Sequence, residues 1–281
     1  MKKKLKTTFK KLKLNEDNLV NSIKAIKLLD QEKTKSYEYE NIYLYILCKN
    51  QIKKRDGEND LLDEETSQNL NKLKNKMIRL PCDLINEENQ LKILLIVEDE
   101  KEQKSLEDDL KISEADEEHL EILALNEFTQ LIKSLKSEKK NININCMYHA
   151  IIASDKLKNR INQILNSLTQ VQEQADTIYY KPQKSLLDFL QNLITLSAKS
   201  SLLKIVKTKT HNDVFKIKIA NNTMKNSEIY KNVKTTLYRI VSLILATLNK
   251  YTTVKAVVLK SKSSLPFEIY GKIDEEDLEL F

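Results

Sequence analysis

Glycine and proline are almost absent from this chain, with two glycines and three prolines in 281 residues. Glycine supplies the positive φ angles of tight turns, and it allows a backbone to approach a phosphate closely. The scarcity therefore disfavours turn-dense all-β folds. It also rules out the G-x-G-x-x-G and Walker motifs that cradle nucleotide phosphates, so we expect no nucleotide cofactor. Helices and short polar connections are favoured instead.

The middle of the chain alternates between apolar runs and helical patterns. LKILLIVE (91–98) is a nearly continuous apolar run, typical of a strand buried on both faces of a parallel sheet. Further strands are predicted at 120–125, 146–154 and 176–180, with amphipathic helices between them. This order predicts an α/β unit with a mainly parallel sheet over residues 83–178.

The two ends of the chain follow a different pattern. A helix is predicted at 15–30 and a strand at 41–49, and two strands, a long helix and the final strands follow Pro182. Residues 1–82 and 179–281 are therefore expected to form the two halves of one discontinuous domain. The fold class is α/β, with the α/β unit inserted between these halves and a crossing near Pro81 and another near Pro182.

Charge is segregated along the sequence. Residues 98–121 hold twelve acids and three lysines, a net charge of 3 − 12 = −9, whereas residues 181–272 hold seventeen Lys/Arg and four acids, 17 − 4 = +13. An acidic and a basic segment in one chain suggest that the basic one faces a polyanion. The alternative is that a lysine-rich chain is simply charged throughout, with its side chains solvated.

A lysine-rich hairpin is the first candidate site. If LLKIVKTK (202–209) and VFKIKIA (214–220) are joined by a two-residue loop at Asn212-Asp213, Lys209 lies opposite Lys216 and Lys207 opposite Lys218. Like charges facing each other destabilise a sheet, and an RNA backbone would neutralise them. The alternative is that the lysines extend into water or pair with acids of the C-terminal tail.

The segment VVLKSKSSLP (257–266) is the second candidate. Lys260 and Lys262 alternate with Leu259 and Ser261 near the end of a predicted strand, and Ser263 and Ser264 follow where pairing should stop. Hydroxyls and backbone amides beside lysines could contact phosphates and ribose 2′-hydroxyls. Because few aromatic residues belong to this footprint, a base-stacking platform is not expected.

No catalytic site is predicted. Cys146 and His149 have a C-x-x-H spacing, but on a strand they would point to opposite faces, as a buried thiol and a partly exposed imidazole. The three cysteines lie far apart and form no metal motif. No apolar run is long enough to span a bilayer, and the lysine-rich N-terminus lacks the apolar stretch of a secretory signal. We therefore expect an intracellular protein that is not an enzyme and has no metal and no membrane association.

Several motifs, in their order along the chain, are similar to the ribosomal L1 domain family. They are IRLPCDL (78–84), LKILLIVED (91–99), YHAIIASDKLKNRI (148–161), YYKPQK (179–184), EIYKNVKTTLYRIV (228–241) with Asn232, and VKAVVLKSKSSLPFEIY (254–270). The resemblance spans residues 15–271. It implies a ribosomal L1-like two-domain fold: a discontinuous α+β domain I, and an inserted Rossmann-like domain II without a nucleotide.

The resemblance also implies RNA binding through domain I. The family's Ser-Thr-Met-Gly loop corresponds to Ser263, Ser264 and Leu265, and its strand entry falls near Lys35. Leu265 stands where the family has a glycine, and the family's glycine-rich stretch is missing over 158–182. Leu265 argues against the family's close contact between RNA and this loop. The missing glycine-rich stretch points to the branch of nucleolar ribosome-assembly factors. The expected partners are then pre-rRNA and pre-ribosomal proteins in the nucleolus, with the chain monomeric within a large ribonucleoprotein. The alternatives are a mature ribosomal stalk protein and a protein-interaction scaffold.

Overall fold

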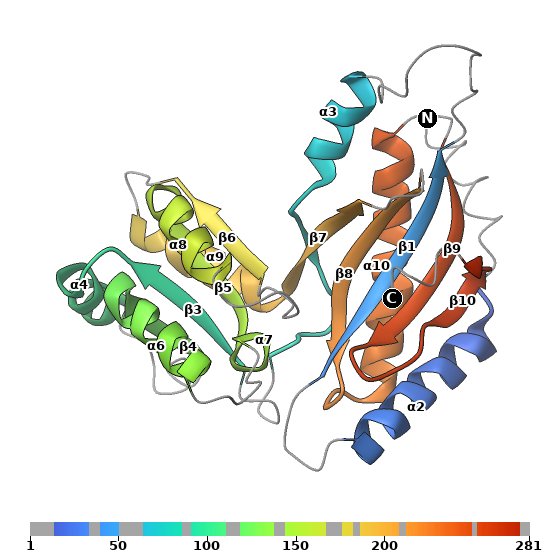
Figure 1. The fold of residues 1–281 in the computed structure, drawn as a ribbon, viewed down its shortest axis with the longest axis horizontal. Coiled ribbons are helices and arrows are strands. Elements are labelled where there is room, and N and C mark those ends of the chain that lie inside the picture. The colour runs from blue at the N-terminus through green and yellow to red at the C-terminus, as the bar shows by residue number, and fades with distance from the viewer. Residues whose placement is uncertain are drawn as a thin grey trace. The chain divides into compact units, whose positions relative to one another are not determined.

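A computed structural model describes residues 14–33, 40–50, 64–85, 91–110, 119–137, 144–166, 176–181, 186–207, 212–248 and 252–275. The protein is a mixed α/β protein with a six-strand antiparallel sheet and a four-strand parallel sheet flanked by helices (Figure 1). Contacts divide it into two compact units. Unit 1 comprises residues 1–82 and 201–281, and unit 2 comprises residues 83–200.

Unit 2 contains the parallel sheet, in the strand order β4-β3-β5-β6. Its elements are β3 (Lys92–Val97), α4 (Glu100–Leu110), β4 (Leu120–Ala124), α6 (Leu125–Ser137), α7 (Ile144–Met147), β5 (Tyr148–Ser154), the 3-10 helix η1 (Asp155–Leu157), α8 (Lys158–Asn166), β6 (Asp176–Tyr180) and α9 (Leu186–Ala198). The predicted parallel strands are therefore confirmed, except that residues 144–147 form the short helix α7 ahead of β5.

Helices cover both faces of this sheet. On β3, Leu94 and Ile96 pack in a core with α6 and α8, whereas Ile93 and Leu95 pack in a second core with α4 and α9. Alternate residues of a strand point to opposite faces, so a strand with a helical layer on each side needs an apolar residue at every position. The continuous apolar run at 91–98 follows directly from this packing.

The chain returns to unit 1 later than the sequence suggests. The predicted division falls after residue 178, whereas the contacts place it after Ser200, so that α9 belongs to unit 2. The reason is that Leu190, Leu193 and Ile194 of α9 pack on β3 and α4. The apolar spacing of α9 predicts a helix but does not reveal which sheet the helix covers.

Unit 1 contains the antiparallel sheet, in the order β10-β9-β1-β8-β7-β2. Its elements are α2 (Glu16–Lys33), β1 (Asn41–Asn50), α3 (Glu64–Leu73), β2 (Lys76–Arg79), β7 (Ser200–Lys207), β8 (Asn212–Asn221), α10 (Asn226–Thr247), β9 (Thr252–Ser261) and β10 (Phe267–Gly271). The N-terminal strand β1 is central, between the C-terminal strands β8 and β9. The two halves of the chain thus build one sheet.

The long helix α10 is buried along one side, as its spacing predicts. Ile229, Val233, Leu237 and Ile240 are all fully or almost fully buried. The fully buried Asn232 accepts a hydrogen bond from the Cys82 amide N–H (2.8 Å) and donates to the carbonyls of Cys82 (3.0 Å) and Ile219 (2.8 Å). This one side chain joins the helix, β8 and the last residue of the N-terminal half.

Strand β10 ends at Gly271, which has a φ of +68°. A Cβ at this position would lie 2.0 Å from the carbonyl oxygen of Lys255 on the neighbouring strand β9. Both the backbone angle and the close approach require glycine here.

Candidate nucleic-acid interface

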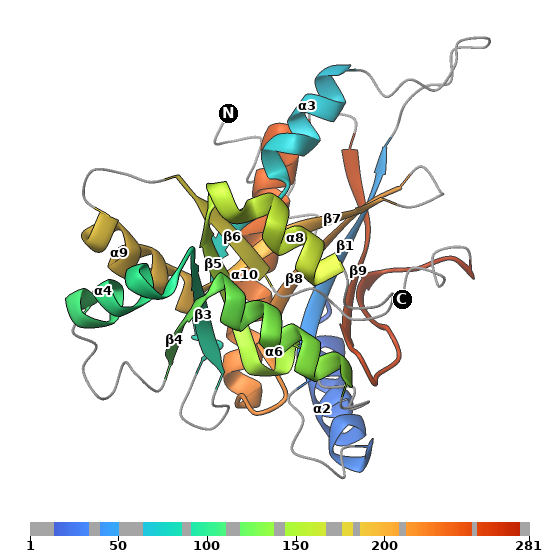
Figure 2. The same cartoon turned by 60° about the vertical axis from the view of Figure 1, so that its left-hand side comes forward.

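One face of the antiparallel sheet packs against helices, and the other carries tyrosines and lysines. A buried cluster on the latter contains Tyr43, Tyr45, Leu47, Val214, Ala256 and Val258, all from strands, with Val206 and Ile273 packed against it. Helix α10 runs behind the strands in Figure 1 and lies to one side of β1 and β9 in Figure 2, on the side of the alternate residues Phe215 and Ile217. The alternation of side chains along β1 and β8 therefore separates a helix-covered face from a second face.

We call this second surface the lysine–tyrosine face. It is defined by six residues: Tyr43, Tyr45, Lys204, Lys216, Lys218 and Lys260. In the strand register, Tyr43 lies between Lys218 on β8 and Lys260 on β9, and Lys216 lies between Tyr45 on β1 and Lys204 on β7. Residues directly opposite each other on paired strands share a face, so four lysines from three strands are brought together.

The rings of Tyr43 and Tyr45 lie beneath the ammonium group of Lys216. Their ring centroids are 6.4 Å apart, and the Lys216 ammonium lies 4.0 Å from the Tyr43 centroid and 5.2 Å from that of Tyr45. A cation above the faces of two rings is attracted by their quadrupoles. Both tyrosines are only 7% exposed and Lys218 is 5% exposed. The rings therefore position the Lys216 side chain and do not form an exposed stacking platform.

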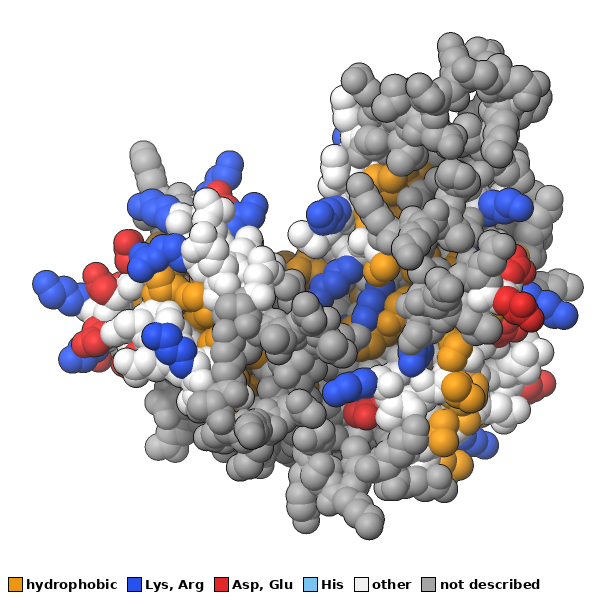
Figure 3. Space-filling view, in the orientation of Figure 1, with side chains coloured by type: hydrophobic (Ala, Val, Ile, Leu, Met, Phe, Trp, Pro, Cys, Tyr) orange, Lys and Arg blue, Asp and Glu red, His pale blue; other side chains and the backbone are white. Residues whose placement is uncertain are grey.

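Basic side chains gather over these strands in the space-filling view. Figure 3 shows Lys and Arg side chains following one another over the region of β7, β8 and β1, with hydrophobic side chains between them, whereas acidic side chains lie toward β9 and β10. Asp274, which follows β10, pairs with Lys255 of β9 at 2.6 Å. Positive charge is thus concentrated near the centre of the sheet.

The predicted register of the β7–β8 hairpin is wrong. Lys216 lies opposite Lys204 and not Lys209, and Lys207 lies opposite Asp213 and not Lys218. Asn212 and Asp213 belong to β8 and do not form a two-residue loop. The slip is an odd number of residues, and an odd slip exchanges the two faces of a strand. Lys204 consequently shares a face with Lys216 and Lys218.

Lys260 occupies the expected strand end but is held by its own loop. Its ammonium donates to the carbonyl oxygens of Ser264 (2.8 Å) and Ser261 (3.3 Å). Ser264 is 4% exposed; its hydroxyl accepts from the Ser261 N–H (2.9 Å) and donates to the Leu265 carbonyl (3.0 Å). Lys262 is exposed, and Leu265 is 74% exposed.

The prediction that the hydroxyls and backbone amides of the serine loop (residues 261–264) are free to bind a ligand is therefore wrong. Both the backbone N–H (3.1 Å) and the hydroxyl (2.6 Å) of Ser263 donate to the carboxylate of Glu40. This carboxylate precedes β1, 223 residues away in sequence. The serines close the loop with internal hydrogen bonds and do not present their polar groups to a ligand. The negative charge of Glu40 also disfavours a phosphate at this loop.

The remaining predicted site residues fall outside what the structure describes. Lys35 and Lys209 lie outside the described residues, and for Lys207 only the backbone register is described. The sequence prediction missed Tyr43, Tyr45 and Lys204. The available signal was the i, i+2, i+4 spacing of Tyr43, Tyr45 and Leu47 in NIYLYILCK (41–49), which places two tyrosines on one face of a strand.

The C-x-x-H pair is not arranged as the sequence suggests. Cys146 lies in the helix α7, so the two residues do not share a strand. His149 is 1% exposed and not partly exposed, and its Nε2 lies 3.1 Å from the Ser197 carbonyl and 2.9 Å from that of Ser200. Within the described part of the chain, no group of three or more His, Cys, Asp or Glu side chains could hold a metal ion, and no helix is long and apolar enough to cross a membrane.

Comparison with known proteins identifies no family for this chain. No family model matches the chain, and no curated protein matches it. The resemblance to the ribosomal L1 domain family consequently depends on the sequence motifs alone.

Proposed function

We propose that this protein is a non-enzymatic RNA-binding protein whose contact surface is the lysine–tyrosine face. One observation carries the proposal: Lys204, Lys216, Lys218 and Lys260 come from β7, β8 and β9 and lie on the sheet face opposite the helices. The surface is built by both ends of the chain, since β1 separates β8 from β9.

Lysines in such an arrangement suit a phosphate backbone. Neighbouring strands are about 4.8 Å apart and alternate residues of one strand about 6.6 Å apart, so the ammonium groups can follow successive phosphates. Each neutralised phosphate releases counterions, which makes the affinity strongly salt-dependent. The buried tyrosines reduce the mobility of Lys216 before binding, so less side-chain entropy is lost on contact. Backbone contacts of this kind read RNA shape more than RNA sequence.

The motif resemblance supplies the finer proposal. In it, the chain has a ribosomal L1-like fold, with unit 1 as domain I and unit 2 as a Rossmann-like domain II, and it binds structured pre-rRNA in nucleolar pre-ribosomal particles as an assembly factor. The support is the order of the motifs and the missing glycine-rich stretch, which separates the chain from the mature stalk protein. The internally bonded serine loop argues against the family's loop contact, so the proposed contact moves to the sheet face.

A quadruple substitution tests the surface. Lys204, Lys216, Lys218 and Lys260 are changed to glutamine, and binding to structured pre-rRNA fragments is measured by fluorescence anisotropy at several salt concentrations. We expect at least a tenfold loss of affinity. We also expect the slope of log K against log salt to fall by about 2, since Lys218 is buried and the three partly exposed lysines contribute roughly 0.7–0.9 each.

The matched control changes four exposed lysines of unit 2, Lys101, Lys104, Lys133 and Lys181, to glutamine. Both variants lose the same formal charge, so a general effect of net charge would weaken them equally. Circular dichroism and the urea midpoint establish that both variants fold. Equal losses in the two variants, or an unchanged salt slope in the first, would contradict the proposed surface.

A protein-interaction scaffold is the second candidate, favoured by one feature of unit 2. Helix α4 presents Glu107, Asp108 and Asp109 to solvent while Leu106 and Leu110 face the core. A partner with a basic surface would suit this helix. In-cell crosslinking separates the candidates: pre-rRNA supports the assembly factor, mature rRNA from polysomes a stalk protein, and proteins without RNA the scaffold.

A further inference from the structure

A small pocket in unit 2 lies outside the proposed RNA surface. It has a volume of about 140 Å³ and is located at the carboxyl ends of β3, β5 and β6. In the sheet order β4-β3-β5-β6, the strand that follows β3 in the chain (β4) lies on one side of it, and the next strand (β5) lies on the other side. The strand order therefore reverses between β3 and β5. The carboxyl edge between two such strands is where open α/β sheets bind ligands.

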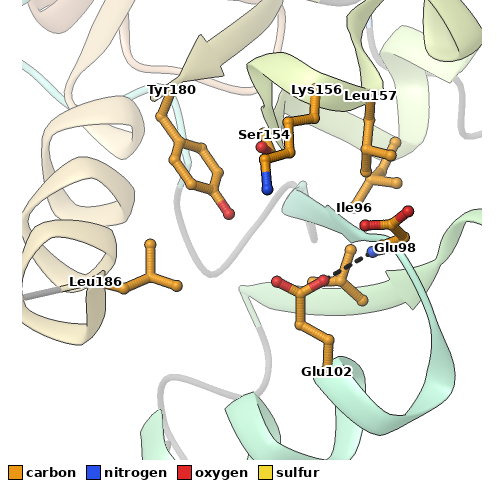
Figure 4. Close-up of a pocket in the computed structure, with 9 residues that line it drawn as sticks. Ile96, Glu98, Glu102, Ser154, Lys156, Leu157, Tyr180 and Leu186 are labelled. Atoms are coloured by element: carbon orange, nitrogen blue, oxygen red, sulfur yellow. Dashed lines mark hydrogen bonds between the residues drawn. The ribbon is translucent and has the colours of Figure 1, made fainter. Parts of the chain in front are cut away.

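Three hydrogen-bond donors line one side of this pocket. The hydroxyl of Ser154, at the end of β5, is buried and has no hydrogen-bond partner within the protein. Figure 4 shows the Lys156 ammonium and the Tyr180 hydroxyl pointing into the same space. Burial, with a smaller effect of the nearby Glu102 carboxylate, raises the pKa of Tyr180 to about 12, so this hydroxyl remains a donor at neutral pH. A buried hydroxyl without a partner is costly, and a ligand atom would satisfy it.

Two carboxylates line the opposite side. Glu102 accepts a hydrogen bond from the Glu98 N–H at 2.9 Å, which fixes the Glu102 side chain at the edge of the pocket (Figure 4). The Glu98 carboxylate lies on the same side of the view. Leu157 and Leu186 supply apolar wall between the polar groups. The pocket therefore has a cationic side and an anionic side around a narrow space.

This polarity selects the class of ligand. An anion alone would contact Lys156 but meet two carboxylates, and a cation alone would contact the carboxylates but meet Lys156. A molecule with both charges satisfies both sides. The volume is close to that of an engineered cavity of about 150 Å³ that accepts benzene, a molecule of six heavy atoms. A nucleotide is much larger, but a small amino acid is of this size.

We propose that the pocket of unit 2 binds a small zwitterion, a free amino acid or a close analogue. Its carboxylate contacts Lys156, Ser154 and Tyr180, and its ammonium contacts Glu102 and Glu98. The site belongs to the parallel sheet and uses none of the residues of the lysine–tyrosine face. It would make unit 2 a small-molecule-binding unit whether or not unit 1 binds RNA.

Titration of the full-length ¹⁵N-labelled protein with glycine, L-alanine and L-serine tests this proposal by NMR. We expect saturable shifts of the amide signals of Glu98, Ser154 and Tyr180, with a Kd of about 1 mM or lower for at least one amino acid. Acetate and methylammonium, which each carry one of the two charged groups, should bind at least tenfold more weakly. Because no RNA is present, the result is independent of the proposed function.

Substitutions then assign the two sides. Lys156→Met and Glu102→Gln should each weaken amino-acid binding at least tenfold, and Ser154→Ala by a smaller factor. Lys133→Met, which removes an exposed lysine of α6 away from the pocket, should leave binding unchanged. The amide spectrum of each variant shows whether unit 2 remains folded. Absence of saturable shifts with all three amino acids, or equally tight binding of acetate or methylammonium, would overturn the proposal.

Discussion

The two sheets of this protein use their faces differently. The parallel sheet of unit 2 has helices on both faces, so that consecutive residues of β3 are buried in two different cores. The antiparallel sheet of unit 1 has its helices on one face and carries lysines and tyrosines on the other. Helices on both faces of a sheet leave its edges for ligands, whereas a sheet with helices on one face can carry polar side chains along the strands of the other.

This difference explains why the two proposed sites have different forms. In unit 2 the polar residues of the proposed site lie at the ends of β3, β5 and β6 and in the adjoining α4 and η1, where they line a small pocket. In unit 1 they alternate with core residues along β8, where Phe215 and Ile217 face the helices and Lys216 and Lys218 do not. The first arrangement suits a compact molecule and the second suits an extended polymer.

The largest effects should come from placing a charge within the strands. We expect Leu94→Asp and Leu95→Asp each to lower the free energy of unfolding by about 4 kcal/mol or more, since both positions are fully buried but in opposite cores. On β8, Phe215→Asp should be equally severe, whereas Lys216→Gln should cost only about 1 kcal/mol. Urea denaturation measures all four variants. A small loss of stability at either leucine would contradict the burial of β3 on both faces, because it would mean that one face of the strand is not packed in a core.

A smaller loss of stability is expected when the hydrogen bonds of the Asn232 side chain are removed. Asn232→Ala removes three hydrogen bonds and should lower the free energy of unfolding by about 2–3 kcal/mol. Lys231→Ala, an exposed neighbour on the same helix, is the matched control. Hydrogen exchange should show faster opening in unit 1 and unchanged protection in β3 and β5. If unit 2 lost protection to the same extent, the two units would not be separate cooperative structures.

Alkaline pH should weaken unit 2 through its tyrosines. Burial raises the pKa of Tyr180 to about 12, with a further contribution from Glu102, and raises that of Tyr179 to about 12, with a contribution from Asp155. In the unfolded chain these groups ionise near the ordinary value of 10, so the unfolded state loses protons first. Stability is therefore lost as the pH rises from about 10 to 12. Tyr180→Phe should make this decline shallower when the urea midpoint is followed against pH, and an identical decline in the variant would contradict the assignment.

The smallest effect concerns the negative charge beside the serine loop. Glu40→Gln keeps an acceptor for the Ser263 hydroxyl but removes the charge near one end of the lysine–tyrosine face. We expect RNA affinity to rise by about twofold at low salt and the difference to disappear at high salt, because the charge is screened. Glu107→Gln on α4 provides the control. A loss of affinity in Glu40→Gln would mean that the loop's shape matters more than its charge.

Regular patterns were sufficient to predict much of the fold. The apolar run of β3 predicts burial on two faces, and the three- and four-residue spacing of α10 predicts its buried side, because these signals depend on local geometry. The register of β7 and β8 could not be predicted in this way. Lysines recur at 204, 207, 209, 216 and 218, so several registers pair lysines equally well, and no glycine marks the turn.

The candidate site was predicted only in part for a related reason. Lys216, Lys218 and Lys260 were named from their alternation, but the partners that determine their roles come from distant segments. Tyr43 reaches them only through strand pairing, and Glu40 meets Ser263 across 223 residues of sequence. Contacts at such separations leave no trace in a local pattern.

Gly271 has a consequence for how this sequence can vary. In a chain with only two glycines, position 271 accepts no side chain at all, because any Cβ would collide with the Lys255 carbonyl oxygen. Directly after it, Ile273 packs against the tyrosine cluster and Asp274 pairs with Lys255. In a library of random single substitutions, this position should therefore be among the least permissive of the C-terminal half. Its variants should detach the last strand while leaving the parallel sheet intact.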